Sequence, residues 1–123
     1  MLINPKLLYK VLYENEDGTK NAITLSEDVS LFSYIEIIYG QVNRYLMKSE
    51  KFPSDQRSVG LSLTNCSNNG TVLYVSNKNY AISGNTISVA ATNRYIYYEV
   101  AANKIQNYLH RDDIYIYKVL GYK

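Results

Sequence analysis

The amino-acid sequence predicts one all-β domain over residues 1–123, an antiparallel β-sandwich of jelly-roll-like type with about eight to ten short strands. Composition is the first reason, because fourteen Tyr and thirteen Asn favour strands and tight turns respectively. The second is a period-two alternation of apolar residues in many short segments. The third is the absence of any strand–helix–strand pattern. The length is that of a single domain with one modest core.

Residues 7–13 form the first apolar segment. Its alternating positions would share one face of a strand, although its leucines and valine also fit a helical stripe. Two Tyr and one Val in the segment favour the strand. Asp17-Gly18 then indicates a tight turn, so residues 21–25 are expected to return as the partner strand of a hairpin.

The next segment combines a short turn with the clearest strand of the chain. Residues 26–29 can open one helical turn, because Ser26 is a good N-cap and acidic residues favour the first turn. Residues 33–39 are expected to be extended. Their alternation places Ile35, Ile37 and Tyr39 on one face and Tyr34, Glu36 and Ile38 on the other.

The middle of the chain predicts two further strands separated by a loop. Residues 42–48 are expected to form a strand that pairs through Gly40, and residues 51–55, which contain Pro53, are expected to form the loop. Residues 58–63 alternate cleanly. Their inward-facing side chains would be Val59, Leu61 and Leu63.

Two dipeptides predict hairpins in the second half. Asn69-Gly70 precedes residues 71–75, which are expected to pair with the strand at 58–63. Gly84-Asn85 joins residues 80–82 to residues 86–89. The last expected strands are residues 94–100, 105–109 and 114–120, with residues 110–113 as a turn.

Several of these strands carry apolar or tyrosine side chains on both faces, whereas the outer faces of a lone sandwich should be polar. The additional tyrosines either lie exposed without a partner or are covered by a ligand or by another copy of the chain. On the second interpretation, tyrosines of the last strands would make the contact, with one glutamate as a polar partner. The candidate contact residues are Tyr95, Tyr97, Glu99, Tyr115 and Tyr117.

Charge and cysteine content exclude several classes of protein. The net charge is +2 and the basic residues are scattered among acidic ones, which argues against binding to nucleic acid. No segment has the length and apolar character of a membrane span, and the first residues lack the pattern of a cleaved signal peptide. Cys66 is the sole cysteine, so the fold is expected to depend on packing without an internal disulfide.

The residues give little support for catalysis, and we expect no enzyme activity, metal or cofactor. His110, the single histidine, lies in a His-Arg-Asp triplet that resembles a kinase motif but lacks the companion motifs, so we interpret it as a solvated turn. Most acidic residues lie in turns. Glu36 and Glu99 lie within strands, and a small hydrolase of cell-wall sugars that uses such a carboxylate pair is the remaining catalytic hypothesis.

Three stretches resemble tail-associated minor structural proteins of phages and prophages of Gram-positive bacteria. They are a threonine-leucine-serine segment at 23–27 followed by the aromatic strand at 32–39, the hairpin at 82–87, and the closing strand at 116–123, which ends in Gly-Tyr-Lys. Together the resemblance extends over residues 12–123. It carries no catalytic residues to transfer, because its motifs are strand patterns.

The resemblance implies a β-sandwich module at a tail tip or on a fibre, often terminal in a longer protein and often oligomeric. The expected localisation is therefore the virion, after synthesis in the bacterial cytoplasm without a signal peptide. We expect a non-catalytic module that contacts host-surface carbohydrate or a neighbouring tail protein. The alternative is a purely structural oligomerisation module, for example a trimer, in which copies bury each other's tyrosines.

Overall fold

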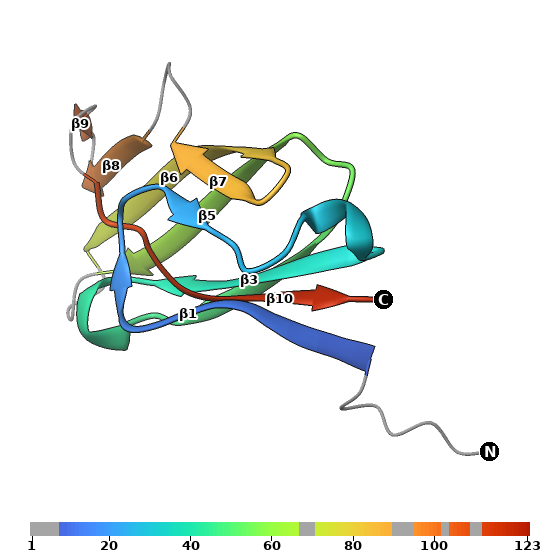
Figure 1. Ribbon diagram of the computed structural model, residues 1–123. Helices are drawn as coiled ribbons and strands as arrows, with labels where there is room; N and C mark the ends of the chain where they lie inside the picture. Colours follow the sequence, from blue (N-terminus) through green and yellow to red (C-terminus); the bar gives the residue numbers. More distant parts are fainter. Residues whose placement is uncertain (1–7, 67–70, 90–94, 102–103, 109–111) are drawn as a thin grey trace.

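The computed structural model describes residues 8–66, 71–89, 95–101, 104–108 and 112–123, and within 95–108 it describes the backbone. These residues contain ten strands and two short 3-10 helices, which confirms the predicted all-β class (Figure 1). The elements are β1 (Tyr9–Thr19), β2 (Ile23–Thr24), η2 (Val29–Leu31), β3 (Tyr34–Gly40), η3 (Val42–Arg44), β4 (Lys48–Pro53), β5 (Ser58–Cys66), β6 (Val72–Ser83), β7 (Thr86–Val89), β8 (Tyr95–Ala101), β9 (Lys104–Tyr108) and β10 (Tyr115–Tyr122).

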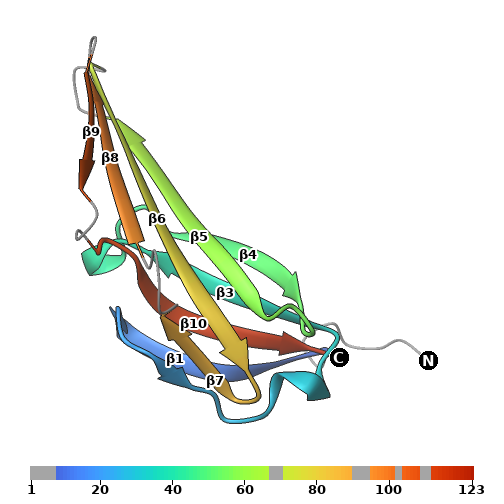
Figure 2. The same cartoon turned by 90° about the horizontal axis from the view of Figure 1, so that it is seen from above.

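The strands form two antiparallel sheets that face each other. The four-stranded sheet has the order β1-β10-β3-β4, so the first and last strands of the chain are neighbours. The six-stranded sheet has the order β2-β7-β6-β8-β9, with β5 on the free side of β6. Figure 2 shows that β8, β9 and the adjoining parts of β5 and β6 extend beyond the four-stranded sheet.

The core lies between the two sheets and follows the predicted alternation. Ile35, Ile37 and Tyr39 of β3 are fully buried, and they face the equally buried Val59 and Leu61 of β5 across one continuous cluster. Tyrosine is part of this interior, because burying the large ring removes much apolar surface from water. Three of the largest fully buried side chains are Tyr39, Tyr80 and Tyr117.

The predicted hairpin at the start of the chain is wrong. β1 continues past Asp17-Gly18 to Thr19 and pairs with β10, while β2 crosses to the other sheet and pairs with β7. Gly18 has φ +73°, and a Cβ added to it would lie 2.7 Å from Cε1 of Tyr117. The glycine therefore serves an irregularity in β1 that lets this ring approach the backbone, and not a reversal of the chain.

The expected strand at 42–48 and loop at 51–55 are also wrong, because the loop comes first and the strand second. After β3 the chain forms η3, and Asn43, Arg44 and Leu46 adopt the left-handed region with φ between 55° and 59°. Such residues cannot continue a strand. β4 begins only at Lys48, and it accommodates Pro53 at its end because it is an edge strand.

The helical turn lies slightly later than predicted. It is η2, and its N-cap is Asp28, whose Oδ1 accepts a hydrogen bond of 2.9 Å from the backbone N–H of Ser30. Asp28 takes the place expected for Ser26, since a carboxylate caps the first turn equally well. No helix in the described part of the chain is long and apolar enough to cross a membrane.

The later strands agree with the sequence pattern. β5 pairs with β6, and β6 turns into β7 around Gly84, which has φ +58°. The final three expected strands correspond to β8, β9 and β10. The predicted turn residues Asn69-Gly70 and His110 lie outside the described residues.

Candidate functional site

A row of aromatic residues crosses one end of the four-stranded sheet on its outer side. The register places Tyr9 of β1 beside Tyr122 of β10, Tyr122 beside Tyr34 of β3, and Tyr34 beside Pro53 of β4. The Tyr9 and Tyr122 ring centroids are 5.8 Å apart with an interplanar angle of 45°. We call this surface, with its flanking side chains, the aromatic face; it consists of Leu8, Tyr9, Tyr34, Lys51, Pro53, Tyr122 and Lys123.

The pleat of the strands explains why these rings point outward. Residues in a strand alternate between the two faces, so burial of Ile35 in the core turns Tyr34 toward solvent. In β10, Gly121 lies against the ring of Phe32, since an added Cβ would stand 2.7 Å from ring atoms Cγ and Cδ1. The glycine lets Phe32 pack beneath the strand, and the following Tyr122 then lies on the outer side.

Hydrogen bonding and charge shape the aromatic face. The Tyr122 hydroxyl donates to Oε1 of Glu36 at 2.6 Å, and this bond, with some burial and the charge of Glu36, raises the pKa of Tyr122 to about 12. Nζ of Lys51 lies 4.6 Å from the centroid of the Tyr122 ring, and Nζ of Lys123 lies 5.3 Å from that of Phe32. Both distances are typical of cation–π contacts.

The aromatic face includes a shallow hollow of about 420 Å³, lined by Leu8, Tyr34, Lys51, Pro53, Tyr122 and Lys123. The volume is within the range of small-molecule sites. Tyr34 is 52% exposed and Leu8 is 44% exposed, so a ligand would find apolar area already presented. The arrangement can stack flat groups on tyrosine rings while lysine and glutamate supply polar contacts.

The candidate contact residues from the sequence fall on two different sheets. Tyr95, Tyr97 and Glu99 lie in β8 of the six-stranded sheet, where they pair in register with Lys78, Ser76 and Tyr74 of β6. Tyr115 and Tyr117 lie in β10 of the four-stranded sheet. The fold therefore does not gather the five residues on one sheet.

Tyr117 is a core residue and not a surface residue. It is 1% exposed, and its hydroxyl donates to the carbonyl oxygen of Gln41. The Tyr117 hydroxyl oxygen in turn accepts a 3.0 Å hydrogen bond from the backbone N–H of Arg44. The β10–β3 register shifts between Ile116 and Lys118, so the bulge removes Tyr117 from the expected alternation. In the folded chain the Tyr117 ring is therefore buried and is not presented on the surface.

Tyr115 remains accessible in part. It is half-buried, and Nζ of Lys20 lies 5.5 Å from its ring centroid. Its backbone pairs with Gly40 at the far end of β3 from Tyr34. Seven residues of β3 separate the two positions by roughly 20 Å at 3.3 Å per residue. Tyr115 is therefore not part of the aromatic face.

A buried polar cluster lies at the end of the core near Tyr115. Nζ of Lys78 donates to Oδ2 of Asp112 at 2.8 Å and to the carbonyl oxygen of Lys20 at 2.8 Å, and the Lys78 side chain has no exposure. Burial lowers the pKa of Lys78 and raises that of Tyr80, whose buried hydroxyl has no hydrogen-bond partner among the described residues. Asp112 is thus an ion-pair partner, and its expected role as a solvated turn residue is wrong.

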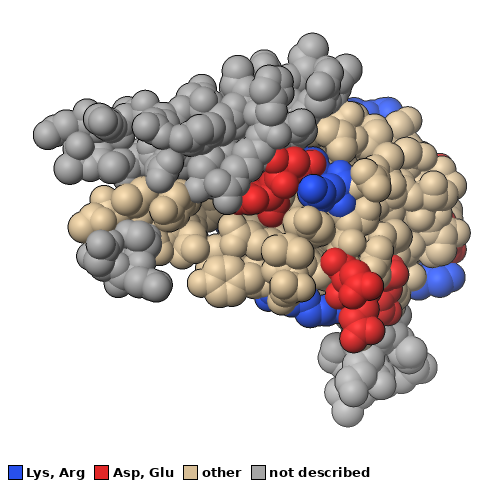
Figure 3. Space-filling model, turned by 90° about the vertical axis from the view of Figure 1, so that its left-hand side faces the viewer, with Lys and Arg blue, Asp and Glu red and all other residues tan. Residues whose placement is uncertain are grey.

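The surface around this end carries both signs of charge. Figure 3 shows this end of the molecule with acidic and basic side chains beside each other on the described surface. The described residues include no group of three or more His, Cys, Asp or Glu that could hold a metal ion. Lys78 and Asp112 satisfy one another, so we assign the pair to the stability of the core.

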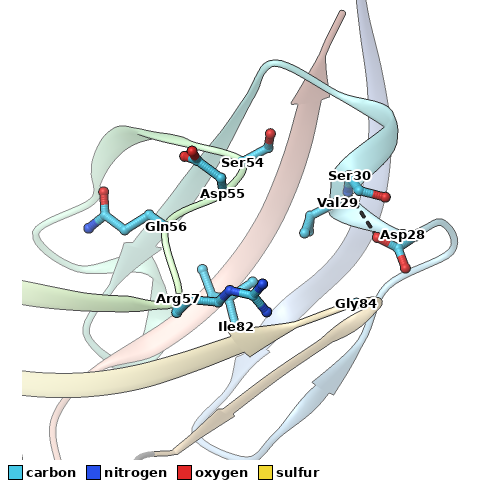
Figure 4. A pocket seen from close by; sticks show the side chains of 9 residues that line it. All are labelled: Asp28, Val29, Ser30, Ser54, Asp55, Gln56, Arg57, Ile82 and Gly84. Carbon is cyan, nitrogen blue, oxygen red and sulfur yellow. Dashed lines mark hydrogen bonds between the residues drawn. The ribbon is translucent and has the colours of Figure 1, made fainter.

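A second, more polar pocket of about 450 Å³ lies where η2, the β4–β5 turn and the β6–β7 turn meet (Figure 4). Asp28 is engaged there in capping η2, and its hydrogen bonds to Ser30 lower its pKa. Arg57 extends over Ile82 toward the turn at Gly84. Asp28 and Arg57 thus belong to the turns at this end of the sandwich, and we assign them a structural role.

The carboxylate pair considered for sugar hydrolysis gains no support from the fold. Glu36 lies in β3 of the four-stranded sheet and accepts its bond from Tyr122, whereas Glu99 belongs to β8 of the other sheet. Hydrolases of this kind hold two carboxyl groups within about 5–9.5 Å around one bond.

Sequence reasoning missed the aromatic face. Tyr34 and Glu36 were placed correctly on the outer face of their strand, but Tyr9 and Tyr122 were not linked to them. A signal was present in the alternation around Ile35 and in the terminal Gly121-Tyr122. The missing information was the pairing of the first and last strands, which one sequence does not reveal.

Fold and site together define an antiparallel β-sandwich with a lysine-flanked aromatic face on its four-stranded sheet. A scan against protein-family models finds no match, and a search of curated proteins finds no relative.

Proposed function

We propose that this protein is a non-catalytic binding and assembly module of a phage tail or virion, and that it contacts host-surface carbohydrate through the aromatic face. A neighbouring tail protein is the other partner consistent with the same surface. The sequence resemblance to tail-associated proteins supports the setting. The row of tyrosines supports the contact surface.

The observation that carries the proposal is the concentration of exposed apolar side chains on one sheet face. Leu8, Tyr9, Val11 and Tyr34 are 38–52% exposed and lie together on or beside the aromatic face. Scattered apolar residues are normal on a protein surface, but a contiguous group marks an interaction site. Tyrosine suits this purpose because its rigid ring contributes contact area at low entropic cost.

A glycan-array experiment tests the proposal. We expect the protein to bind a subset of the arrayed oligosaccharides and the double variant Tyr9→Ser, Tyr34→Ser to lose that binding by tenfold or more, since exposed aromatic anchors dominate such contacts. Thermal unfolding should be nearly unchanged because both rings are exposed. Tyr45→Ser is the matched control, because Tyr45 is 57% exposed but lies beyond the far end of β3.

Further variants separate the alternatives. Binding that survives the double variant and is lost in Tyr95→Ser, Tyr97→Ser would place the contact on β8 and contradict the assignment to the aromatic face. Tyr115→Ser tests the remaining sequence-derived candidate in the same way. Detection of the protein in purified phage particles by mass spectrometry tests the virion setting.

The same surface permits a purely structural oligomerisation module, in which copies of the chain cover each other's tyrosines. Light scattering distinguishes this function. A stable trimer or dimer that dissociates in the Tyr9→Ser, Tyr34→Ser variant favours it, whereas a monomer at micromolar concentration contradicts it. We favour carbohydrate binding because Lys51 and Lys123, which form no ion pair with a described carboxylate, also lie on this face.

A further inference from the structure

The two lysines of the aromatic face, Lys51 and Lys123, differ from most other described lysines because they form no ion pair with a described carboxylate. Lys10, Lys48, Lys78 and Lys118 each have a carboxylate oxygen within 4 Å, belonging respectively to Glu27, Glu50, Asp112 and Glu14. Lys51 and Lys123 form no such pair within the described part of the chain. Each places its ammonium group over an aromatic ring instead.

Lys51 forms no ion pair with a described carboxylate even though a glutamate lies at the paired position of the neighbouring strand. Lys51 lies directly opposite Glu36 in the β3–β4 register, a position that favours an ion pair. The Glu36 carboxylate instead accepts the hydroxyl of Tyr122, and the Lys51 ammonium lies over the face of the Tyr122 ring. Tyr122 therefore contacts both neighbours, and Lys51 has no carboxylate partner in the part of the chain that the structure describes.

The two ammonium groups border the same hollow. Lys51 and Lys123 line it together with Tyr34 and Tyr122, so positive charge and aromatic area face one ligand. A neutral sugar would use the rings alone. A sugar that carries a negative group would also form charge-assisted hydrogen bonds with the ammonium groups, which are stronger than neutral ones.

We infer that the aromatic face binds carbohydrate that carries negative charge, in the form of phosphate, sulfate or carboxylate groups. This inference rests on the proposed function and specifies its ligand class. Tyr34 and Tyr122 contact the apolar faces of sugar rings, and Lys51 and Lys123 hold the anionic substituent. Glu36 is not part of the row Tyr9–Tyr122–Tyr34–Pro53; it pairs in register with Leu120 and Lys51, and the Tyr122 hydroxyl donates to its carboxylate.

An array of paired oligosaccharides tests the inference. Each pair shares one sugar backbone and differs by a phosphate, a sulfate or a uronic acid carboxylate. We expect tighter binding to the charged member and weaker binding as the salt concentration rises, because salt screens exposed charges. Lys51→Gln and Lys123→Gln should each weaken binding to charged members about two- to fivefold, the effect of one exposed ion pair.

Lys118→Gln is the matched control. Lys118 lies on the same strand as Tyr122 and pairs with Glu14 at 3.7 Å, but it stands four residues away, roughly 13 Å along β10. We expect its substitution to leave binding unchanged. Equal losses in Lys118→Gln and Lys51→Gln would indicate a general charge effect and overturn the assignment to the hollow.

The remaining outcomes separate this inference from the function on which it rests. Equal binding to neutral and charged members, with no effect of Lys51→Gln or Lys123→Gln, overturns the charge requirement. The proposed function still stands in that case if Tyr9→Ser, Tyr34→Ser abolishes binding. Absence of binding to every oligosaccharide overturns the inference and leaves a protein partner for the aromatic face.

Discussion

Tyrosine and lysine meet in two regions of this sandwich with opposite consequences. On the aromatic face, Nζ of Lys51 lies 4.6 Å from the Tyr122 ring centroid at an exposed site and has no carboxylate partner within the described residues. In the core, Nζ of Lys78 lies 5.2 Å from the Tyr80 ring centroid, and the side chain is buried beside Asp112. The contacts are similar, but the surrounding solvent is not.

The two lysines differ in whether their ammonium groups are exposed to water. A buried ammonium group has lost its water and requires a fixed counter-charge, so Lys78 is committed to Asp112 and to the carbonyl oxygen of Lys20. An exposed ammonium group keeps its water until a ligand arrives. The inner pair, Lys78 and Asp112, thus stabilises the fold, whereas Lys51 and Tyr122 on the aromatic face are available for binding.

Removal of Asp112 should have the largest effect on stability. Asp112→Ala leaves the Lys78 charge buried without a counter-ion and should lower the free energy of unfolding by about 3–5 kcal/mol. Chemical denaturation measures the change. Glu14→Ala breaks the exposed pair with Lys118 and should cost at most about 1 kcal/mol. Equal costs in the two variants would contradict a structural role for the inner pair.

Gly18→Ala should also destabilise the fold, by more than about 2 kcal/mol. It adds a Cβ at φ +73° that would lie 2.7 Å from Cε1 of the buried Tyr117 ring. Gly84→Ala isolates the backbone part, because Gly84 has φ +58° while its nearest contact is an ordinary 3.4 Å. We expect about 1–2 kcal/mol for that control. A smaller loss for Gly18→Ala than for Gly84→Ala would refute the packing described for Tyr117.

Tyr122→Phe should produce the smallest change, visible in alkaline solution. The folded state raises the pKa of Tyr122 from 10.0 to about 12, so the protonated phenol is favoured by folding. This contribution is fully present below pH 10 and is lost as the pH rises toward 12. Urea unfolding between pH 9 and 12 should show a shallower loss of stability in Tyr122→Phe than in the wild type or in Tyr45→Phe. Identical profiles would exclude the bond to Glu36.

The fold was predictable where a strand follows strict alternation. β3 and β5 have side chains whose faces can be read from the sequence, since a one-residue slip would expose Ile35 or Leu61. The hairpin at Gly84 was likewise encoded locally. Alternation failed at Tyr117, because a bulge depends on the long-range contact with Gly18 and the loop at Gln41.

The candidate site was predictable only in its residue type. An excess of tyrosine indicated aromatic surface, but its position depends on the pairing of β1 with β10 and of β10 with β3. Within the site, Tyr122 pairs with Tyr9, 113 positions earlier in the chain, and with Tyr34, 88 positions earlier. The state of Lys51 depends in turn on Tyr122, a neighbour that no local pattern reveals.

Amide chemical shifts in a titration with the tightest-binding arrayed glycan test the comparison most directly. Ligand-induced shifts should cluster at Tyr9, Tyr34, Lys51 and Tyr122, while the amides of Lys78 and Asp112 should stay in place. Shifts centred on Lys78, on Tyr115 or on the pocket at Arg57, with none in the aromatic row, would contradict the assignment of binding to the outer sheet face.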